Sequence, residues 1–155
     1  MFSVRMKKTF AVVSLVLLPV AASVARDIPV SVGNNHDFSL TCKSGNFTGV
    51  VEGTAGRHAQ AGKWVQTKRY KITRINGQKG GNKANVNLSA GKAPNFSRDN
   101  VVYSPDRMIQ DGQWHDLNLT RHNLAAGSSR VEAAYEFIFD KSGSDPRCWT
   151  DSVTF

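Results

Sequence analysis

The stretch Val131–Phe139, Val-Glu-Ala-Ala-Tyr-Glu-Phe-Ile-Phe, decides the fold class of this 155-residue chain. Alternate positions of this stretch separate onto two faces of an extended backbone. One face carries Val131, Ala133, Tyr135, Phe137 and Phe139, and the other carries Glu132, Ala134, Glu136 and Ile138. Strict alternation of this kind is typical of a half-buried strand. Helical periodicity is weak after residue 25, so the sequence predicts an all-β protein.

The residues that follow this stretch predict a partner strand. Lys141–Pro146 has the composition of a turn, with Gly, Ser, Asp and Pro in succession. A last strand is predicted over Cys148–Phe155, with Trp149, Val153 and Phe155 on one face. We expect these two strands to form a hairpin, or to lie beside each other across a longer connection.

Further strands are predicted upstream, separated by turn-forming residues. They cover Ile28–Val32, Asp37–Lys43, Phe47–Glu52, Lys63–Ile75, Ala84–Leu88, Asn100–Ser104 and Trp114–Arg121. Many short strands at this spacing predict a sandwich or a small barrel. We expect residues 26–155 to form a single antiparallel β-sandwich of about seven to nine strands, immunoglobulin-like or similar. The Gly- and Ala-rich segments 53–62 and 89–99 are expected to be connecting or binding loops.

The first 25 residues have the three-part pattern of a secretory signal. Arg5, Lys7 and Lys8 form a positive start, an uncharged apolar block follows, and Ser23-Val24-Ala25 provides a small-residue cleavage site. A membrane anchor would need roughly 20 apolar residues, which this block does not supply. We therefore predict a cleaved signal over residues 1–25, a secreted or periplasmic location, and no transmembrane segment after cleavage.

The chain has two cysteines, Cys42 and Cys148. Paired cysteines in an exported protein favour a disulfide. Free redox thiols are the alternative, but the chain has no C-x-x-C motif and neither cysteine has an activating neighbour in sequence. The sequence thus predicts one structural bridge between the two ends of the domain.

Charge is unevenly distributed along a chain whose net charge is +8. No acidic residue lies between Glu52 and Asp99, whereas that interval holds ten basic residues: Arg57, Lys63, Lys68, Arg69, Lys71, Arg74, Lys79, Lys83, Lys92 and Arg98. Such segregation is typical of a surface that binds anions. The alternative is an edge strand whose lysines prevent pairing with other chains.

The segment Lys63–Ile75 provides the predicted site. Tyr70 and Ile72 share the buried face, which leaves Arg69 and Lys71 pointing outward. A bulge or strand end is expected near Arg74, and a hairpin turn at Asn76-Gly77 should return the chain beside the same face. The predicted patch of ligand-binding residues contains Arg69, Lys71, Arg74, Lys79 and Lys83, with Trp64 or Tyr70 at its margin.

Patterns that support catalysis or metal binding are weak. His115 and His122 are seven residues apart, so on one regular strand they face opposite sides and make a poor metal pair. Glu132 and Glu136 share a face, but their backbones lie roughly 13 Å apart, farther than glycosidase carboxylates. We predict no catalytic residues, no metal and no cofactor.

The predicted function is an exported, non-enzymatic binding module with a basic face for an anionic partner. An acidic glycan, a lipid headgroup phosphate or an acidic protein surface would suit such a face, and genomic nucleic acid is not expected outside the cytoplasm. Two alternatives stay open. One is a periplasmic or secreted inhibitor or immunity-type protein. The other is a small secreted hydrolase acting on RNA or glycan, with His58, His115 or His122 as acid and base.

Overall fold

The computed structural model describes residues 25–93, 96–98 and 100–155, and within these ranges the chain is all-β with no helix. The predicted signal over residues 1–25 lies outside them, apart from Ala25. The strands are β1 (Arg26–Asp27), β2 (His36–Ser44), β3 (Phe47–His58), β4 (Gly62–Arg74), β5 (Asn85–Lys92), β6 (Val101–Val102), β7 (Trp114–Asp116), β8 (Thr120–Arg121), β9 (Val131–Ile138), β10 (Arg147–Trp149) and β11 (Val153–Thr154).

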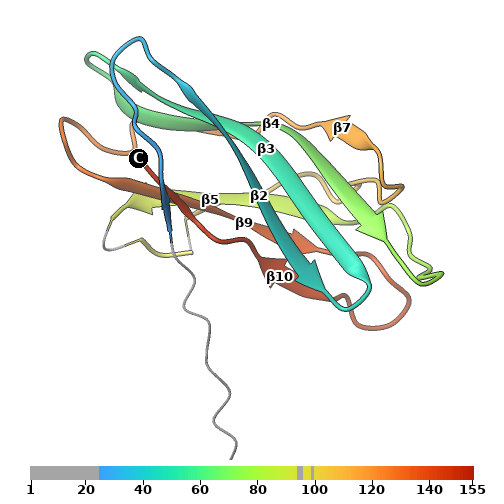
Figure 1. Cartoon of the computed structure of the whole chain (residues 1–155). Coiled ribbons are helices and arrows are strands. Elements are labelled where there is room, and N and C mark those ends of the chain that lie inside the picture. The colour runs from blue at the N-terminus through green and yellow to red at the C-terminus, as the bar shows by residue number, and fades with distance from the viewer. Residues whose placement is uncertain (1–24, 94–95, 99) are drawn as a thin grey trace, which may run out of the picture.

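The strands form two sheets that pack face to face, as in a β-sandwich (Figure 1). One sheet has the order β2-β3-β4-β7, with β8 also paired to β4. The other has the order β1-β11-β9-β5-β6, with β10 paired to β9. The predicted all-β class and the two packed layers are therefore confirmed. Within the described ranges, no segment forms a helix that could span a membrane.

Strand β9 behaves as its alternation predicts. All five residues of its apolar face, Val131 through Phe139, have side chains with no exposed surface. The opposite face carries the partly exposed Glu132 and Glu136. Burial of this continuous apolar row against the β2–β3–β4 sheet forms the centre of the core.

One end of the sandwich is closed by a disulfide and by aromatic packing. The predicted Cys42–Cys148 bridge is present, and it joins β2 of one sheet to β10 of the other. Nearby, the Phe47 and Phe139 rings stack with their centroids 5.0 Å apart. Gly49 lies so close to Phe137 that an added Cβ would be 2.4 Å from that ring. We call this region the disulfide end.

A buried hydrogen bond also connects the two sheets near their middle. The hydroxyl groups of Thr67 on β4 and Tyr135 on β9 lie 2.9 Å apart. Both side chains are buried, and desolvation raises the pKa of the Tyr135 phenol well above its usual range. The contact satisfies two polar groups that would otherwise be costly to bury.

The predicted last strand, Cys148–Phe155, is interrupted and changes face. Cys148 pairs with Phe137 and Trp149 with Glu136, whereas Val153 pairs with Ala133. Trp149 is therefore on the outer face, and the prediction that it shares a face with Val153 and Phe155 is wrong. An extra residue near Thr150 causes the change. Thr150 donates its N–H to the Tyr135 carbonyl at 2.9 Å and accepts from the Tyr135 N–H through its hydroxyl at 3.0 Å.

The predicted strand Ile28–Val32 is also wrong. The ladder instead ends with β1, at Arg26–Asp27, which runs parallel to β11, so the sheets are not wholly antiparallel. The Ile28 N–H still donates to the Thr154 carbonyl at 2.8 Å. Pro29 follows, and because proline has no N–H to donate, the ladder stops there.

Three other predicted boundaries differ from the structure. Most of the predicted loop 53–62 is strand, because β3 continues to His58 and β4 begins at Gly62. Likewise β5 extends to Lys92, into the predicted loop 89–99. The predicted strand Trp114–Arg121 is divided into β7 and β8. This split and that of the last strand give eleven strands in the described ranges, where about seven to nine were expected.

The turn at Asn76-Gly77 is present, but it does not form a hairpin. Asn76 and Gly77 both have positive φ, 54° and 66°, and the Gln78 N–H donates to the Ile75 carbonyl at 3.0 Å. The chain then crosses to the other sheet, where β5 pairs with β9 and β6. The prediction that the chain returns beside β4 is therefore wrong.

Candidate functional site

A β-bulge in the middle of β4 determines which of its basic side chains face outward. Glu52 pairs with Arg69 and Gly53 pairs with Thr67, so Lys68 is the extra residue. Lys68 and Arg69 are consequently both exposed, although they are adjacent in sequence. Gly53 is required opposite the bulge, since an added Cβ would lie 2.5 Å from the Phe38 ring and 2.7 Å from the Gln66 carbonyl oxygen. The bulge or strand end predicted near Arg74 is present as the end of β4, and this second irregularity at Lys68 was not predicted.

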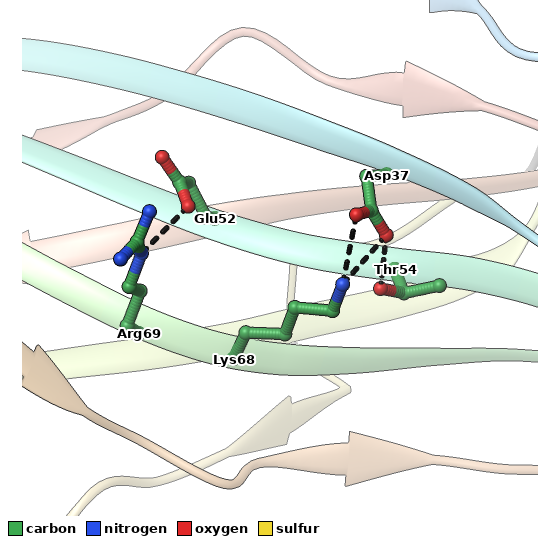
Figure 2. Close-up of polar contacts among 5 residues, drawn as sticks. All are labelled: Asp37, Glu52, Thr54, Lys68 and Arg69. Carbon is green, nitrogen blue, oxygen red and sulfur yellow. Dashed lines mark hydrogen bonds and ion pairs between the residues drawn. The ribbon is translucent and has the colours of Figure 1, made fainter.

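The two bulge cations each contact an acid from another strand of the same sheet (Figure 2). Lys68 donates to both carboxylate oxygens of Asp37 at 2.8 Å, and the Thr54 hydroxyl donates to the same carboxylate at 2.5 Å. Arg69 Nε donates to Glu52 Oε2 at 2.7 Å. The hydrogen bond from Lys68, and then that from Thr54, holds the pKa of Asp37 below its usual range.

A tryptophan adds an aromatic surface to this side of the sheet. Trp114 on β7 pairs with Lys71 on β4. The Arg69 guanidinium carbon lies 4.6 Å from the centroid of the Trp114 ring, and Lys71 Nζ lies 4.8 Å from it. Both distances are within the range of cation–π contact. We name the group Asp37, Glu52, Lys68, Arg69, Lys71 and Trp114 the outer-face cluster.

The outer-face cluster borders a depression of about 520 Å³. Its lining includes Ser39 and Asp116 besides the bulge residues. The surface therefore offers hydrogen-bond donors on β4 and acceptors on β2, β3 and β7. Acids from these other strands of the sheet offset part of the charge that appears unopposed in the sequence of β4.

The residues of the predicted basic patch lie on different segments of the fold. Arg69 and Lys71 lie on the outer face, but Arg74 pairs with Phe47, which belongs to the inward row. The Arg74 guanidinium donates to the Gly80 carbonyl at 2.6 Å. Lys79 and Lys83 lie in the crossover between the sheets, where the Lys83 N–H donates to Asp140 at 2.8 Å. The crossover leads from β4 to the other sheet, so these two cations do not lie on a strand paired with β4.

Trp64 lies on the outer side of β4 but beyond the bulge, near the start of that strand. It pairs with Gly56, and its ring stacks on that of His58 with the centroids 5.8 Å apart. The structure thus places Trp64 apart from Trp114, the aromatic residue that contacts Arg69 and Lys71.

The sequence does not predict Trp114, Lys68, Asp37 or Glu52 as residues of the site. The bulge that exposes Lys68 does have a signal in the sequence of β4. Val65 and Thr67 alternate in one phase, whereas Tyr70 and Ile72 alternate in the other, so one residue between them must be extra. No signal in a single sequence identifies which acids of other strands lie opposite these cations.

The histidines considered for catalysis are dispersed. His115 Nε2 lies 2.8 Å from Asp111 Oδ1, and the His115 ring stacks on Tyr70 with the centroids 5.5 Å apart. That hydrogen bond holds the pKa of Asp111 below its usual range. His58 contacts Trp64, as noted above. In the described ranges, no group of three or more His, Cys, Asp or Glu side chains is placed to hold a metal ion.

The two glutamates of β9 have separate partners. Glu132 accepts a hydrogen bond from the Ser152 hydroxyl at 2.5 Å. Glu136 accepts from Asn87 at 3.3 Å and forms an ion pair with Arg147 at 3.4 Å. These contacts are those of a polar strand face.

Comparisons of this chain with protein-family models, with curated proteins and with solved structures find no match. Its function must therefore be argued from its own residues.

Proposed function

We propose that this protein is an exported binding module, without catalytic activity, that holds an acidic glycan on the outer-face cluster. The observation that carries the proposal is the contact of two cations, Arg69 and Lys71, with one Trp114 ring on an open sheet face. Anionic groups would bind the two cations, and the apolar face of a sugar ring would lie against the indole.

The mixed charge of the face favours a glycan over the other anionic partners. Sugar hydroxyl groups need acceptors, and Asp37, Glu52 and Asp116 provide carboxylates beside the cations. Those carboxylates repel the charged groups of any anionic partner. A glycan offsets that repulsion with many hydroxyl donors, whereas a lipid phosphate surface or an acidic protein surface offers fewer, so both are second to a glycan.

The Cys42–Cys148 disulfide supports a secreted or periplasmic location, because such bonds persist in oxidising compartments. The signal over residues 1–25 stays a prediction, as do the single domain over residues 26–155 and the immunoglobulin-like variant of the fold.

Retention on a column of an anionic polysaccharide tests this proposal. Arg69→Gln combined with Lys71→Gln removes two charges from the outer-face cluster. Lys79→Gln combined with Lys83→Gln removes two charges from the crossover, so net charge is matched. We expect the first variant to elute at lower salt than the wild type, and the second to elute close to it. Equal elution of both folded variants would show that only net charge matters and would contradict the site.

A second function, hydrolysis of RNA or glycan, is favoured by one observation, the His115–Asp111 pair. A carboxylate that orients a histidine is a recurring part of acid–base sites. Turnover by the wild type that is lost in folded His115→Ala would support this function over binding alone. The inhibitor or immunity-type function predicts instead that the protein co-purifies with one stoichiometric protein partner.

A further inference from the structure

The end of the sandwich opposite the disulfide contains a buried lysine. Lys63, near the start of β4, has only 7% of its surface exposed. Its backbone is held on both sides, since its N–H donates to the Ala125 carbonyl at 2.9 Å and its carbonyl accepts from the Leu124 N–H at 3.0 Å. These two backbone hydrogen bonds, and not a charged partner, hold Lys63 in place. We call this region the lysine end.

The ammonium group of Lys63 has no hydrogen-bond or ion-pair partner in the part of the chain that the structure describes. Arg57 pairs with Lys63 across the β3–β4 ladder and adds a second positive charge. Asp27, an acid that lines the same region, is already paired with Arg130. Burial, and then the charges of Arg57 and Arg130, lower the pKa of Lys63. The stem of Lys63 is thus buried while its ammonium has no counter-ion, an arrangement that leaves the charge available to an anionic ligand.

Lys63 lines a depression of about 380 Å³ at this end. Apolar side chains form much of the wall, contributed by Ile28, Pro29, Val30 and Phe155. The volume is within the range of small-molecule sites, which are commonly apolar with a few fixed polar groups. A ligand that filled it would bring one negative charge to Lys63 and an apolar body to the wall.

We propose that the lysine end is a binding site for a small organic acid, with the carboxylate on Lys63 and the apolar body against Ile28, Val30 and Phe155. A carboxylate suits this site better than a phosphate. Phosphate is bound best by several donors or by an arginine fork, and Arg130 is engaged by Asp27. The site is separate from the outer-face cluster, because Lys63 belongs to the inward row of β4 and the outer-face cluster to its opposite face.

Calorimetric titration of the purified protein tests the site with three probes. These are 3-phenylpropanoate, its neutral amide, and inorganic phosphate. We expect heat of binding for the carboxylate alone. Lys63→Met should weaken that binding by about tenfold or more, because a charged hydrogen bond is lost. The control Lys43→Met, an exposed lysine on β2, should bind as the wild type does.

A measurement on the wild type keeps the test independent of how Lys63→Met folds. Amide NMR shifts of Ile28, Lys63 and Phe155 should move with added 3-phenylpropanoate, while those of Arg69 and Trp114 stay in place. The proposal is overturned if the carboxylate binds neither in calorimetry nor at these amides, if the amide or phosphate binds equally well, or if folded Lys63→Met binds unchanged.

Discussion

The two ends of the sandwich differ in what holds the sheets together. At the disulfide end the sheets are joined by Cys42–Cys148 and by stacked phenylalanines. At the lysine end the described residues offer no covalent link between the sheets, and Lys63 is buried without a counter-ion. The first arrangement favours stability. The arrangement at the lysine end lowers stability at a position where a ligand could bind, a trade-off that is common at functional sites.

The largest effect should come from removing the covalent link at the disulfide end. Cys42→Ala combined with Cys148→Ala is expected to lower the free energy of unfolding by about 4 kcal/mol, because the open loop regains entropy in the unfolded chain. Urea unfolding followed by circular dichroism measures the change. Wild-type protein kept under reducing conditions is the control and should match the variant. An unchanged midpoint would mean that packing alone closes this end.

A smaller effect is expected from Gly49→Ala, which tests the packing of the disulfide end without touching the bond. The new Cβ would lie 2.4 Å from the Phe137 ring, so the core must shift, at a cost of about 1–3 kcal/mol. Gly91→Ala is the matched control in β5, toward the lysine end, where the nearest side-chain atom is 3.7 Å away. Thermal unfolding should separate the two variants. Equal melting temperatures of the two variants would show that the core is not packed more tightly at the disulfide end than at the lysine end.

At the lysine end, Lys63→Met should have the opposite sign and raise stability by at most about 1 kcal/mol at neutral pH, since it removes a charge that partial burial and the charges of Arg57 and Arg130 disfavour. The pKa of Lys63 in the folded protein is lowered from its ordinary 10.5. Below the folded pKa the cost is present in full. It fades as pH rises through that value toward 10.5, because the folded state releases its proton first.

Urea unfolding of wild type and Lys63→Met between neutral and alkaline pH measures this change, and Asp27, Arg57 and Arg130 are left unaltered in both proteins. A difference in unfolding free energy that stays constant or grows with pH would contradict the assignment of an unpaired ammonium.

The smallest effect should come from the outer face, between the two ends. Asp37→Asn removes the exposed Lys68 ion pair and should cost about 0.5 kcal/mol at neutral pH. The contribution is present above the ordinary aspartate pKa of 3.8 and is lost as pH falls through the lower folded value. The difference should also shrink at high salt. A loss as large as that at the disulfide end would mean that the outer-face cluster supports the fold.

The sequence predicts well those features that depend on local alternation or on a pair of cysteines. The buried face of β9 and the Cys42–Cys148 bridge are of this kind. Features that depend on strand register are not predictable in the same way. The extra residues at Lys68 and near Thr150 reverse which side chains share a face, and β4 and β5 belong to different sheets although a turn follows β4.

The candidate sites depend even more on contacts between distant segments. The sequence predicts that Arg69 and Lys71 face outward, but Trp114, Asp37 and Glu52 reach them only through pairing of separate strands. In the sequence Lys63 is one of ten basic residues between Glu52 and Asp99, and nothing there distinguishes it from exposed lysines, which are the usual case. Its burial follows from its place in the inward row, which only the structure reveals.

The pairing of β1 with β11 has a consequence for the order of folding. Arg26 lies beside Val153 and Asp27 beside Thr154, so the sheet edge formed by residues 26–27 needs residues that are synthesised more than a hundred positions later. The ladder at this edge, and with it the wall of the lysine end, can assemble only once the C-terminal strand is available. A ribosome-bound chain lacking those residues should therefore be more open to proteases at Ile28 and Val30 than the completed protein.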